Sequence, residues 1–243
     1  MQLLFRVFGL FRHYIRSYEH FRGEVQPVRR RIAVTFACLV AAMTTANPAL
    51  AQDKPVKIVA LGDSLTAGYG LSAGDAFPAK LAAALKAKGI ATNIVNAGVS
   101  GDTASSGLER LDWAVANDTD AVIVELGAND ALRGLDPKVT RKAIDTIVKK
   151  LSDRRIPVLL CGMLAPPNLG ADYGKAFNSI YPDVAKSHDA LLYPFFVEGI
   201  VTNPKLNQRD GLHPTAEGVD VIVQKILPSV EQLIARVKAK RNS

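Results

Sequence analysis

Residues 56–65 read VKIVALGDSL and combine the two features that decide the fold. The first part, Val56–Leu61, is a short and almost continuously apolar run, which ends abruptly in glycine and polar residues. An apolar run of this length without alternation is typical of a parallel strand that is covered on both faces. Four more runs of this kind follow, at Thr92–Asn96, Ala121–Leu126, Pro157–Gly162 and Ala190–Tyr193.

Helical patterns fill the intervals between these strands. They cover residues 77–88, 104–116, 137–152 and 172–188, and a last one runs from Pro214 to about Ala239. Proline at 137 and 214 suits the first turn of a helix, and Gly89 suits the end of one. Strict alternation of strand and helix predicts one three-layer α/β domain over residues 52–243, with a five-stranded parallel sheet.

The net charge of +7 comes mainly from the first 51 residues. These contain seven arginines and two glutamates, whereas the remaining 192 residues hold 23 basic and 21 acidic side chains. A domain that binds nucleic acid concentrates positive charge on its folded part. We therefore expect no nucleic-acid partner.

Residues 1–51 have the pattern of an export leader. Arg29–Arg31 precede the apolar run Ile32–Met43, and the segment ends in Ala49-Leu-Ala51. A basic start, a short apolar run and an Ala-x-Ala ending predict a secretory signal cleaved after Ala51, which places the domain in the periplasm or outside the cell. A membrane anchor is the alternative, but a spanning helix needs about 20 predominantly apolar residues.

Residues 1–27 are more than an ordinary signal needs, and two interpretations stay open. Aromatic residues recur there every three or four positions with arginines between them, the pattern of a basic amphipathic helix on a membrane surface. The other interpretation is a later start of translation, for example at Val28, and it agrees better with the usual proportions of such leaders.

The body of the chain contains few side chains that bind transition metals. Cys161 is its only cysteine, so no disulfide forms within it, and His188 and His213 are its only histidines. A zinc site of histidine and cysteine ligands is therefore not expected. Cys161 follows an apolar run, as a small buried side chain would, and His188 lies near a helix end, where an imidazole complements the helix dipole.

Polar residues and glycines gather where the predicted strands end. Gly62–Leu65 follows the first strand, and residues 96–103, 127–130 and 210–214 follow the second, third and fifth. The carboxyl ends of parallel strands meet at one edge of the sheet, where doubly wound proteins bind their ligands. We therefore expect the functional site at this edge.

Nucleotide-binding motifs do not explain this edge. Residues 68–73 match G-x-G-x-x-A, but the strand ends seven residues earlier and no acidic residue occurs from Ala76 through Gly101. A Gly-Lys-Ser/Thr phosphate loop does not occur in the sequence either. Both nucleotide interpretations fail.

A serine nucleophile fits the residues that remain. Ser64 lies where the chain leaves the first predicted strand, and His213 is the histidine placed to act as its base. Asp210 lies three residues before His213, close enough to orient the imidazole. The backbone N–H groups of Ser64 and Gly101 and the side-chain amide of Asn129 are candidate donors to an oxyanion. The Gly-x-Ser-x-Gly turn of typical α/β-hydrolases is missing.

These residues together resemble the four sequence blocks of the SGNH (GDSL) hydrolases, and most closely the bacterial lysophospholipase L1, thioesterase I and arylesterase group. The resemblance covers nearly all of residues 56–237 and implies a flavodoxin-like sheet. It also implies a catalytic triad of Ser64, Asp210 and His213 and an oxyanion hole of Ser64, Gly101 and Asn129. The implied activity is hydrolysis of aryl esters, acyl thioesters and lysophospholipids through an acyl-enzyme, without a cofactor. Ala128 and Ala131 depart from the glycines that relatives often carry there.

Apolar residues after two of the predicted strands indicate where an acyl chain binds. We expect a groove between the loop after the fourth strand and the segment after the fifth, lined by Met163, Leu164, Leu169, Tyr173, Phe195 and Phe196. The expected partner is a small-molecule or lipid ester. We also expect a transient contact with a membrane surface and a monomeric protein.

Three alternatives remain. A carbohydrate O-deacetylase of the cell envelope would need aromatic platforms and many hydrogen-bonding groups, which these apolar segments do not supply. A binding module without turnover is possible on the same scaffold, since a fold alone does not prove activity. Asp63, Asp130 and Asp210 leave a magnesium site as the third alternative.

Overall fold

The structure is a computed structural model, and it describes residues 54–242 of the 243. The predicted leader, its cleavage after Ala51 and the first two residues of the predicted domain lie outside the described residues. None of the described helices is long and apolar enough to cross a membrane.

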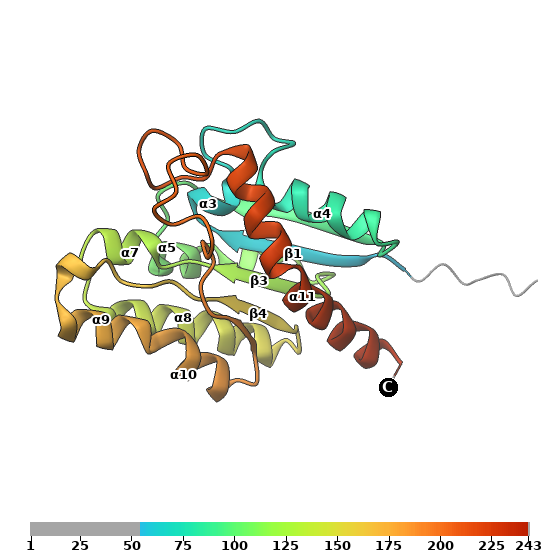
Figure 1. The fold of residues 1–243 in the computed structure, drawn as a ribbon. Helices are drawn as coiled ribbons and strands as arrows, with labels where there is room; N and C mark the ends of the chain where they lie inside the picture. Colours follow the sequence, from blue (N-terminus) through green and yellow to red (C-terminus); the bar gives the residue numbers. More distant parts are fainter. Residues whose placement is uncertain (1–53, 243) are drawn as a thin grey trace, which may run out of the picture. The chain divides into compact units, whose positions relative to one another are not determined.

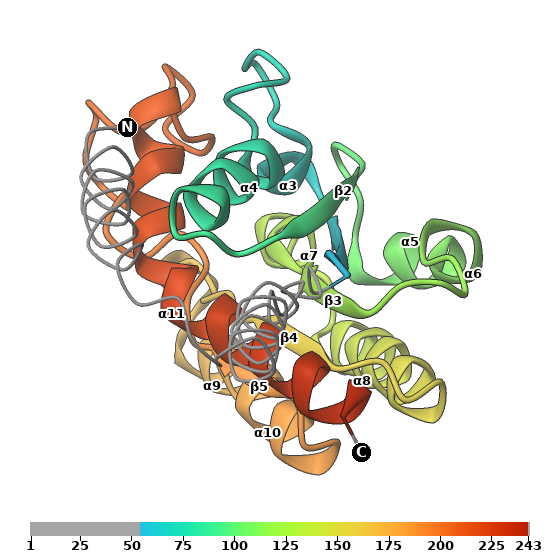
Figure 2. The ribbon, with the colours of Figure 1, turned by 90° about the vertical axis from the view of Figure 1, so that its right-hand side faces the viewer.

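A five-stranded parallel sheet forms the centre of the domain, as the sequence predicts. Its strands run in the order β2-β1-β3-β4-β5 (Figures 1 and 2), which is the strand order of flavodoxin-like folds. Their bounds are β1 (Val56–Gly62), β2 (Thr92–Gly98), β3 (Ala121–Glu125), β4 (Val158–Cys161) and β5 (Leu191–Tyr193). The second strand is longer than predicted because β2 pairs with β1 residue for residue as far as Gly98.

Helices cover both faces of the sheet. They are α3 (Ser64–Ala67), α4 (Phe77–Ala87), α5 (Ala104–Glu109), α6 (Leu111–Ala114), α7 (Ala128–Leu132), α8 (Pro137–Asp153), α9 (Ala171–Asn178), α10 (Ile180–Ser187) and α11 (Ala216–Arg241), with a 3₁₀ turn η1 at Pro167–Leu169. Helices α4 and α11 pack on one face, and α5, α8 and α10 on the other (Figures 1 and 2). This is the predicted three-layer α/β architecture.

Two predicted helices are each interrupted. The helix expected over 104–116 breaks at Arg110, whose buried guanidinium group turns inward to bind Asp102. The helix expected over 172–188 breaks at Ser179, because Pro182 has no N–H to donate to the carbonyl group four residues earlier. The last helix begins at Ala216 rather than at Pro214, since the Thr215 side chain caps it by accepting from Gly218 N–H.

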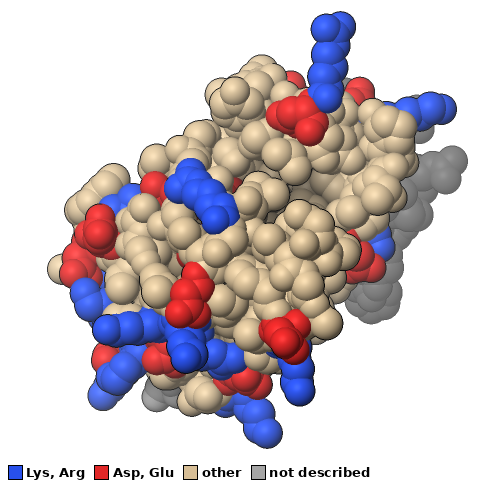
Figure 3. All heavy atoms as spheres, turned by 90° about the vertical axis from the view of Figure 1, so that its left-hand side faces the viewer, with Lys and Arg blue, Asp and Glu red and all other residues tan. Residues whose placement is uncertain are grey.

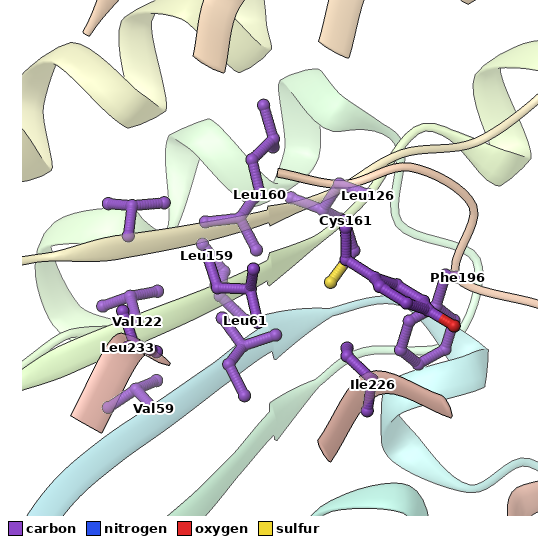
Figure 4. Close-up of a cluster of buried hydrophobic side chains, with 14 of the residues drawn as sticks. Val59, Leu61, Val122, Leu126, Leu159, Leu160, Cys161, Phe196, Ile226 and Leu233 are labelled. Carbon is purple, nitrogen blue, oxygen red and sulfur yellow. The ribbon is translucent and has the colours of Figure 1, made fainter. Parts of the chain in front are cut away.

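The core lies between the sheet and its helices. Figure 4 shows Leu61, Val122 and Leu159 of the sheet beside Ile226 and Leu233 of α11. Cys161 is fully buried in the same cluster, and burial raises the pKa of its thiol well above the usual value. It is therefore a small core side chain, as the sequence predicts. This rigid sheet fixes the positions of the loops at its carboxyl edge.

Candidate active site

Ser64 occupies a tight turn at the carboxyl end of β1. It is the first residue of α3, and Asp63 caps this helix by accepting a hydrogen bond from Leu65 N–H at 2.9 Å. Gly62 lies at the end of β1, directly before Asp63. A Cβ atom at position 62 would collide with the Thr66 side chain and the Glu125 carboxyl group. The turn is therefore possible only with glycine at 62, and it holds the Ser64 hydroxyl at the rim.

A hydrogen-bond chain joins Asp210, His213 and Ser64. His213 Nε2 lies 3.0 Å from Ser64 Oγ, and its Nδ1 lies 2.7 Å from Asp210 Oδ2. The other Asp210 oxygen accepts from the backbone N–H groups of Leu212 and His213 at 2.9 and 3.0 Å. These bonds, that from His213 N–H above all, lower the pKa of Asp210 to about 2. The aspartate thus stays ionised beside the imidazole at any physiological pH.

His188 provides a useful contrast. Its Nε2 lies 2.7 Å from Asp145 of α8, and the residue ends helix α10, as the sequence predicts. No serine hydroxyl group contacts this imidazole among the described residues. Both body histidines therefore bind a carboxylate, but only His213 also contacts a nucleophile.

The candidate oxyanion donors follow the ends of three neighbouring strands, β1, β2 and β3. Within residues 54–242, the backbone N–H groups of Ser64 and Gly101 make no hydrogen bond to the protein. Asn129, in α7, donates from Nδ2 to Asp63 Oδ2 at 3.1 Å and to the Asp102 carbonyl group at 3.0 Å. Ser64 and Asn129 line the same pocket, and the segment that carries Gly101 is held next to Asn129 by the bond to the Asp102 carbonyl group.

Two buried carboxyl groups lie behind the nucleophile. Asp63 and Glu125 are both fully inaccessible to solvent. Burial raises the pKa of Asp63 to about 6, and burial together with the nearby Asp63 charge raises the pKa of Glu125 well above its usual value. Glu125 Oε2 accepts from the Thr66 hydroxyl group at 2.8 Å, while Oε1 has no partner among the described residues. Sequence reasoning missed Glu125, although one charged residue inside an apolar strand was the available signal.

Arg110 is a second residue that sequence reasoning missed. Its Nε donates to Asp102 at 2.6 Å, and its Nη2 donates to the Gly62 carbonyl group at 2.8 Å. The guanidinium group is buried, so this pair is shielded from solvent. It ties the loop that carries Gly101 to the turn that carries Ser64.

The three aspartates considered as a magnesium site each bind different groups of the protein. Asp130 accepts from Ala104 N–H and from the Thr140 hydroxyl group, while Asp63 and Asp210 make the contacts given above. Across the part of the chain that the structure describes, no three His, Cys, Asp or Glu side chains come together as metal ligands. Asp130 instead links α5, α7 and α8.

A pocket of about 280 Å³ opens beside Ser64, Asn129 and His213. Of the six residues predicted to form an acyl groove, Met163, Leu164 and Phe195 line it. The rest of its apolar wall comes from residues that were not predicted, chiefly Leu132, Val197, Ile200, Val201 and Leu212. Figure 3 shows this face of the molecule, which is hollowed near its middle and mostly uncharged there.

The other three predicted groove residues lie elsewhere. Phe196 is fully buried in the core, where its ring packs edge-on against that of Phe77 with the ring centroids 5.0 Å apart. The Tyr173 hydroxyl group donates to the Leu135 carbonyl group at 2.9 Å, and its ring stacks on Phe177. Leu169 lies in η1 and is not among the residues that line the pocket.

Comparison with known proteins gives consistent results. Residues 60–221 match the model of the GDSL-like Lipase/Acylhydrolase family. The chain is 37% identical over 191 residues to an arylesterase of Vibrio mimicus, which covers 78% of this chain and 91% of the relative. It is 38% identical over 178 residues to thioesterase 1/protease 1/lysophospholipase L1 of Escherichia coli K12, which covers 73% and 84%.

Two of the solved structures that this chain resembles are esterases. AlinE4, an SGNH-hydrolase family esterase, is 48% identical, with a TM-score of 0.63 over 74% of this chain and 96% of that one. The psychrotrophic esterase EstA from Pseudoalteromonas sp. is 31% identical, with a TM-score of 0.70 over 74% and 98%. The likeness thus extends over almost the whole length of the two solved structures and over 74% of this chain.

Proposed function

The chain belongs to the GDSL-like lipase/acylhydrolase family and is an ester-hydrolysing enzyme, and from this premise we propose that it is an exported serine esterase that acts through Ser64, His213 and Asp210. One observation carries the proposal. The hydrogen-bond chain from Asp210 through His213 to Ser64 ends at the mouth of an apolar pocket. Nucleophile, base and a place for an acyl group are therefore contiguous.

Acylation uses each member of this chain. Ser64 Oγ attacks the ester carbonyl carbon while its proton passes to His213 Nε2, and Asp210 stabilises the resulting imidazolium. The negative charge that develops on the carbonyl oxygen accepts from the free N–H groups of Ser64 and Gly101. The Asn129 amide is the third donor, and the N–H bond that it directs at the Asp102 carbonyl group is shared with the same oxygen.

Acylation ends when the tetrahedral intermediate collapses. His213 gives its proton to the departing alcohol or thiol, and the acyl group stays on Ser64. In deacylation, His213 takes a proton from a water molecule while the water oxygen attacks the acyl carbon. The second tetrahedral intermediate then breaks its bond to Ser64 Oγ, His213 returns the proton to Ser64, and the carboxylic acid leaves. These steps use water together with side chains and backbone N–H groups of the protein.

The substrate class follows from the pocket. Its wall is apolar apart from the reacting groups and Asn207, which favours an acyl chain over a sugar. Aryl esters, acyl thioesters and lysophospholipids all present a reactive acyl carbon joined to such a chain. The arylesterase and the thioesterase/lysophospholipase among the relatives support this range.

Export is proposed from the leader pattern. Arg29–Arg31, the apolar run Ile32–Met43 and the Ala-x-Ala ending support cleavage after Ala51, so that the mature protein begins at Gln52 in the periplasm or outside the cell. Amino-terminal sequencing of exported protein tests this. Material that begins before Ala49 contradicts it.

A substrate panel tests the proposed activity. The kcat/KM of the purified protein and of Ser64→Ala is measured on 4-nitrophenyl esters from acetate to decanoate, palmitoyl-CoA, lysophosphatidylcholine and acetylated xylan. We expect hydrolysis of the aryl esters, with a rise from acetate to medium chain lengths, and no hydrolysis by Ser64→Ala. A preference for acetylated xylan would replace the proposal with a carbohydrate O-deacetylase.

A further inference from the structure

Exposed apolar side chains converge on the mouth of the pocket. In the part of the chain that the structure describes, eight large hydrophobic residues are exposed, namely Tyr69, Val99, Trp113, Leu132, Val139, Leu164, Val201 and Leu212. Four of the eight, Leu132, Leu164, Val201 and Leu212, line the pocket, and each is 49–52% exposed. We call these four the apolar collar.

The collar is assembled from distant parts of the sequence. Leu132 ends α7, Leu164 follows β4, Val201 lies between β5 and α11, and Leu212 immediately precedes His213. Single exposed hydrophobic residues are ordinary on a soluble surface, but a group that rims one opening marks an interaction site. Met163 and Ile200 already give the pocket interior a buried apolar wall for an acyl chain. The solvent-exposed parts of the four collar side chains are therefore additional apolar surface outside the pocket.

Basic side chains accompany the collar. Arg133 follows Leu132 and donates from Nη2 to the Gly101 carbonyl group, and it has no carboxylate partner among residues 54–242. Arg209 lies three residues before Leu212, is exposed, and makes no hydrogen bond or ion pair in the same described region. The nearby carboxylates are already engaged, since Asp210 binds His213 and Asp102 binds Arg110. The rim therefore presents apolar side chains and unpaired positive charge.

We propose that the apolar collar docks on an anionic lipid surface with the pocket mouth facing the lipid. This inference rests on the proposed hydrolysis of lipid esters. A lipid surface covers the collar and at the same time delivers an acyl ester into the pocket without exposing its chain to water. A protein seated there, including a second copy of this chain, would instead close the entrance to Ser64 and His213. Arg133 and Arg209 supply attraction to anionic headgroups.

The single tryptophan of the chain permits a direct test. Trp113 is 73% exposed and does not line the pocket, so in the parent protein it reports a surface away from the collar. The variant Trp113→Phe with Leu164→Trp moves the only tryptophan into the collar. Both proteins carry Ser64→Ala, so that lipid is not hydrolysed, and both are titrated with vesicles of equal parts phosphatidylglycerol and phosphatidylcholine.

We expect a blue shift of emission for tryptophan at 164, with quenching by brominated acyl chains, and neither effect for Trp113. Adding Leu132→Ser and Leu212→Ser to the collar variant should raise the lipid concentration for half-maximal shift at least tenfold. The matched control is Val139→Ser, which removes an equally exposed side chain outside the pocket. It should leave the lipid concentration for half-maximal shift unchanged. Vesicles of phosphatidylcholine alone should bind more weakly than the anionic ones. Thermal unfolding of each variant confirms that it is folded.

Three results would overturn the docking proposal. The first is no emission change at position 164 with any vesicle, and the second is an equal change at Trp113. The third is a blue shift that depends on protein concentration without lipid, which would assign the collar to contact between two copies. None of these depends on turnover, so ester hydrolysis in the substrate panel stands or fails separately.

Discussion

The side-chain amide of Asn129 donates a hydrogen bond to the carboxylate of Asp63 across 3.1 Å. The residue directly before the proposed nucleophile thus holds the residue proposed to stabilise the oxyanion. The two come from different strand ends, β1 and β3, which pair in the sheet with Gly62 opposite Glu125. The register of the sheet therefore sets the distance between nucleophile and oxyanion donor.

Removal of the Asn129 amide should slow catalysis without unfolding the protein. For Asn129→Ala we expect kcat on 4-nitrophenyl esters to fall on the order of 10²–10³-fold, with a smaller change in KM, because the lost bond forms mainly in the transition state. Asn93→Ala, on the exposed face of edge strand β2, is the matched control. A kcat for Asn129→Ala within threefold of the parent would remove Asn129 from the oxyanion hole.

The two carboxylate–histidine pairs should respond differently to the same change. Asp210→Asn should lower kcat by about 10²–10⁴-fold, because the imidazole loses the acceptor that fixes its tautomer and stabilises its protonated form. Asp145→Asn removes the carboxylate 2.7 Å from His188 and should leave kcat unchanged. Initial rates over pH 6–9 measure both. Equal losses in the two variants would show that the effect is structural.

Stability should depend on pH through the buried carboxyl groups. Asp63 and Glu125 have a higher pKa in the folded protein than their ordinary values of 3.8 and 4.5, so folding takes up protons. Their contribution is full below those ordinary values and is lost as the pH rises, through about 6 for Asp63. The unfolding free energy should therefore rise as the pH falls from 8 towards 5, by up to about 1.4 kcal/mol per pH unit for each proton taken up.

Glu125→Gln isolates one of these two groups. The amide keeps an acceptor for the Thr66 hydroxyl group but cannot titrate, so urea unfolding across pH 5–8 should give a shallower slope than in the parent. Glu109→Gln, an exposed glutamate, is the control and should keep the parental slope. Parallel curves for Glu125→Gln and the parent would mean that Glu125 is ionised in the folded protein.

Acyl preference should depend on the outer wall of the pocket. Val201 and Val139 are each 49% exposed, but only Val201 lines the pocket. Val201→Asp should lower the ratio of kcat/KM for octanoate over acetate at least tenfold, because each buried methylene contributes up to about 0.8 kcal/mol. Val139→Asp should leave the ratio as it is. An unchanged ratio in Val201→Asp would place the acyl chain elsewhere.

The sheet and the Ser64–His213–Asp210 chain are the features that sequence predicted well. Buried parallel strands are continuous apolar runs, and their carboxyl ends lie at one edge, so local patterns determine both the strand count and the meeting place of Ser64 and His213. Helix interruptions at Arg110 and Ser179 were missed. The first depends on a bond to Asp102, and the second on a proline whose effect falls a turn earlier.

The buried carboxyl group and the pocket wall were less predictable. Glu125 contacts Thr66, 59 residues away in sequence, through the pairing of β1 with β3, which no local pattern contains. Phe195 and Phe196 are equally apolar and both follow β5 in a loop, yet Phe195 lines the pocket and Phe196 fills the core. Loop conformation, rather than composition, decided which residues form the wall.

Covalent labelling of Ser64 tests the central claim most directly. The purified protein is titrated with an alkyl fluorophosphonate, residual hydrolysis of a 4-nitrophenyl ester is measured, and the modified peptide is identified by mass spectrometry. We predict one adduct per chain, located on Ser64, formed in proportion to the loss of activity and absent from Ser64→Ala. Complete loss of activity without an adduct on Ser64, or substantial ester hydrolysis by folded Ser64→Ala, would contradict the proposed mechanism.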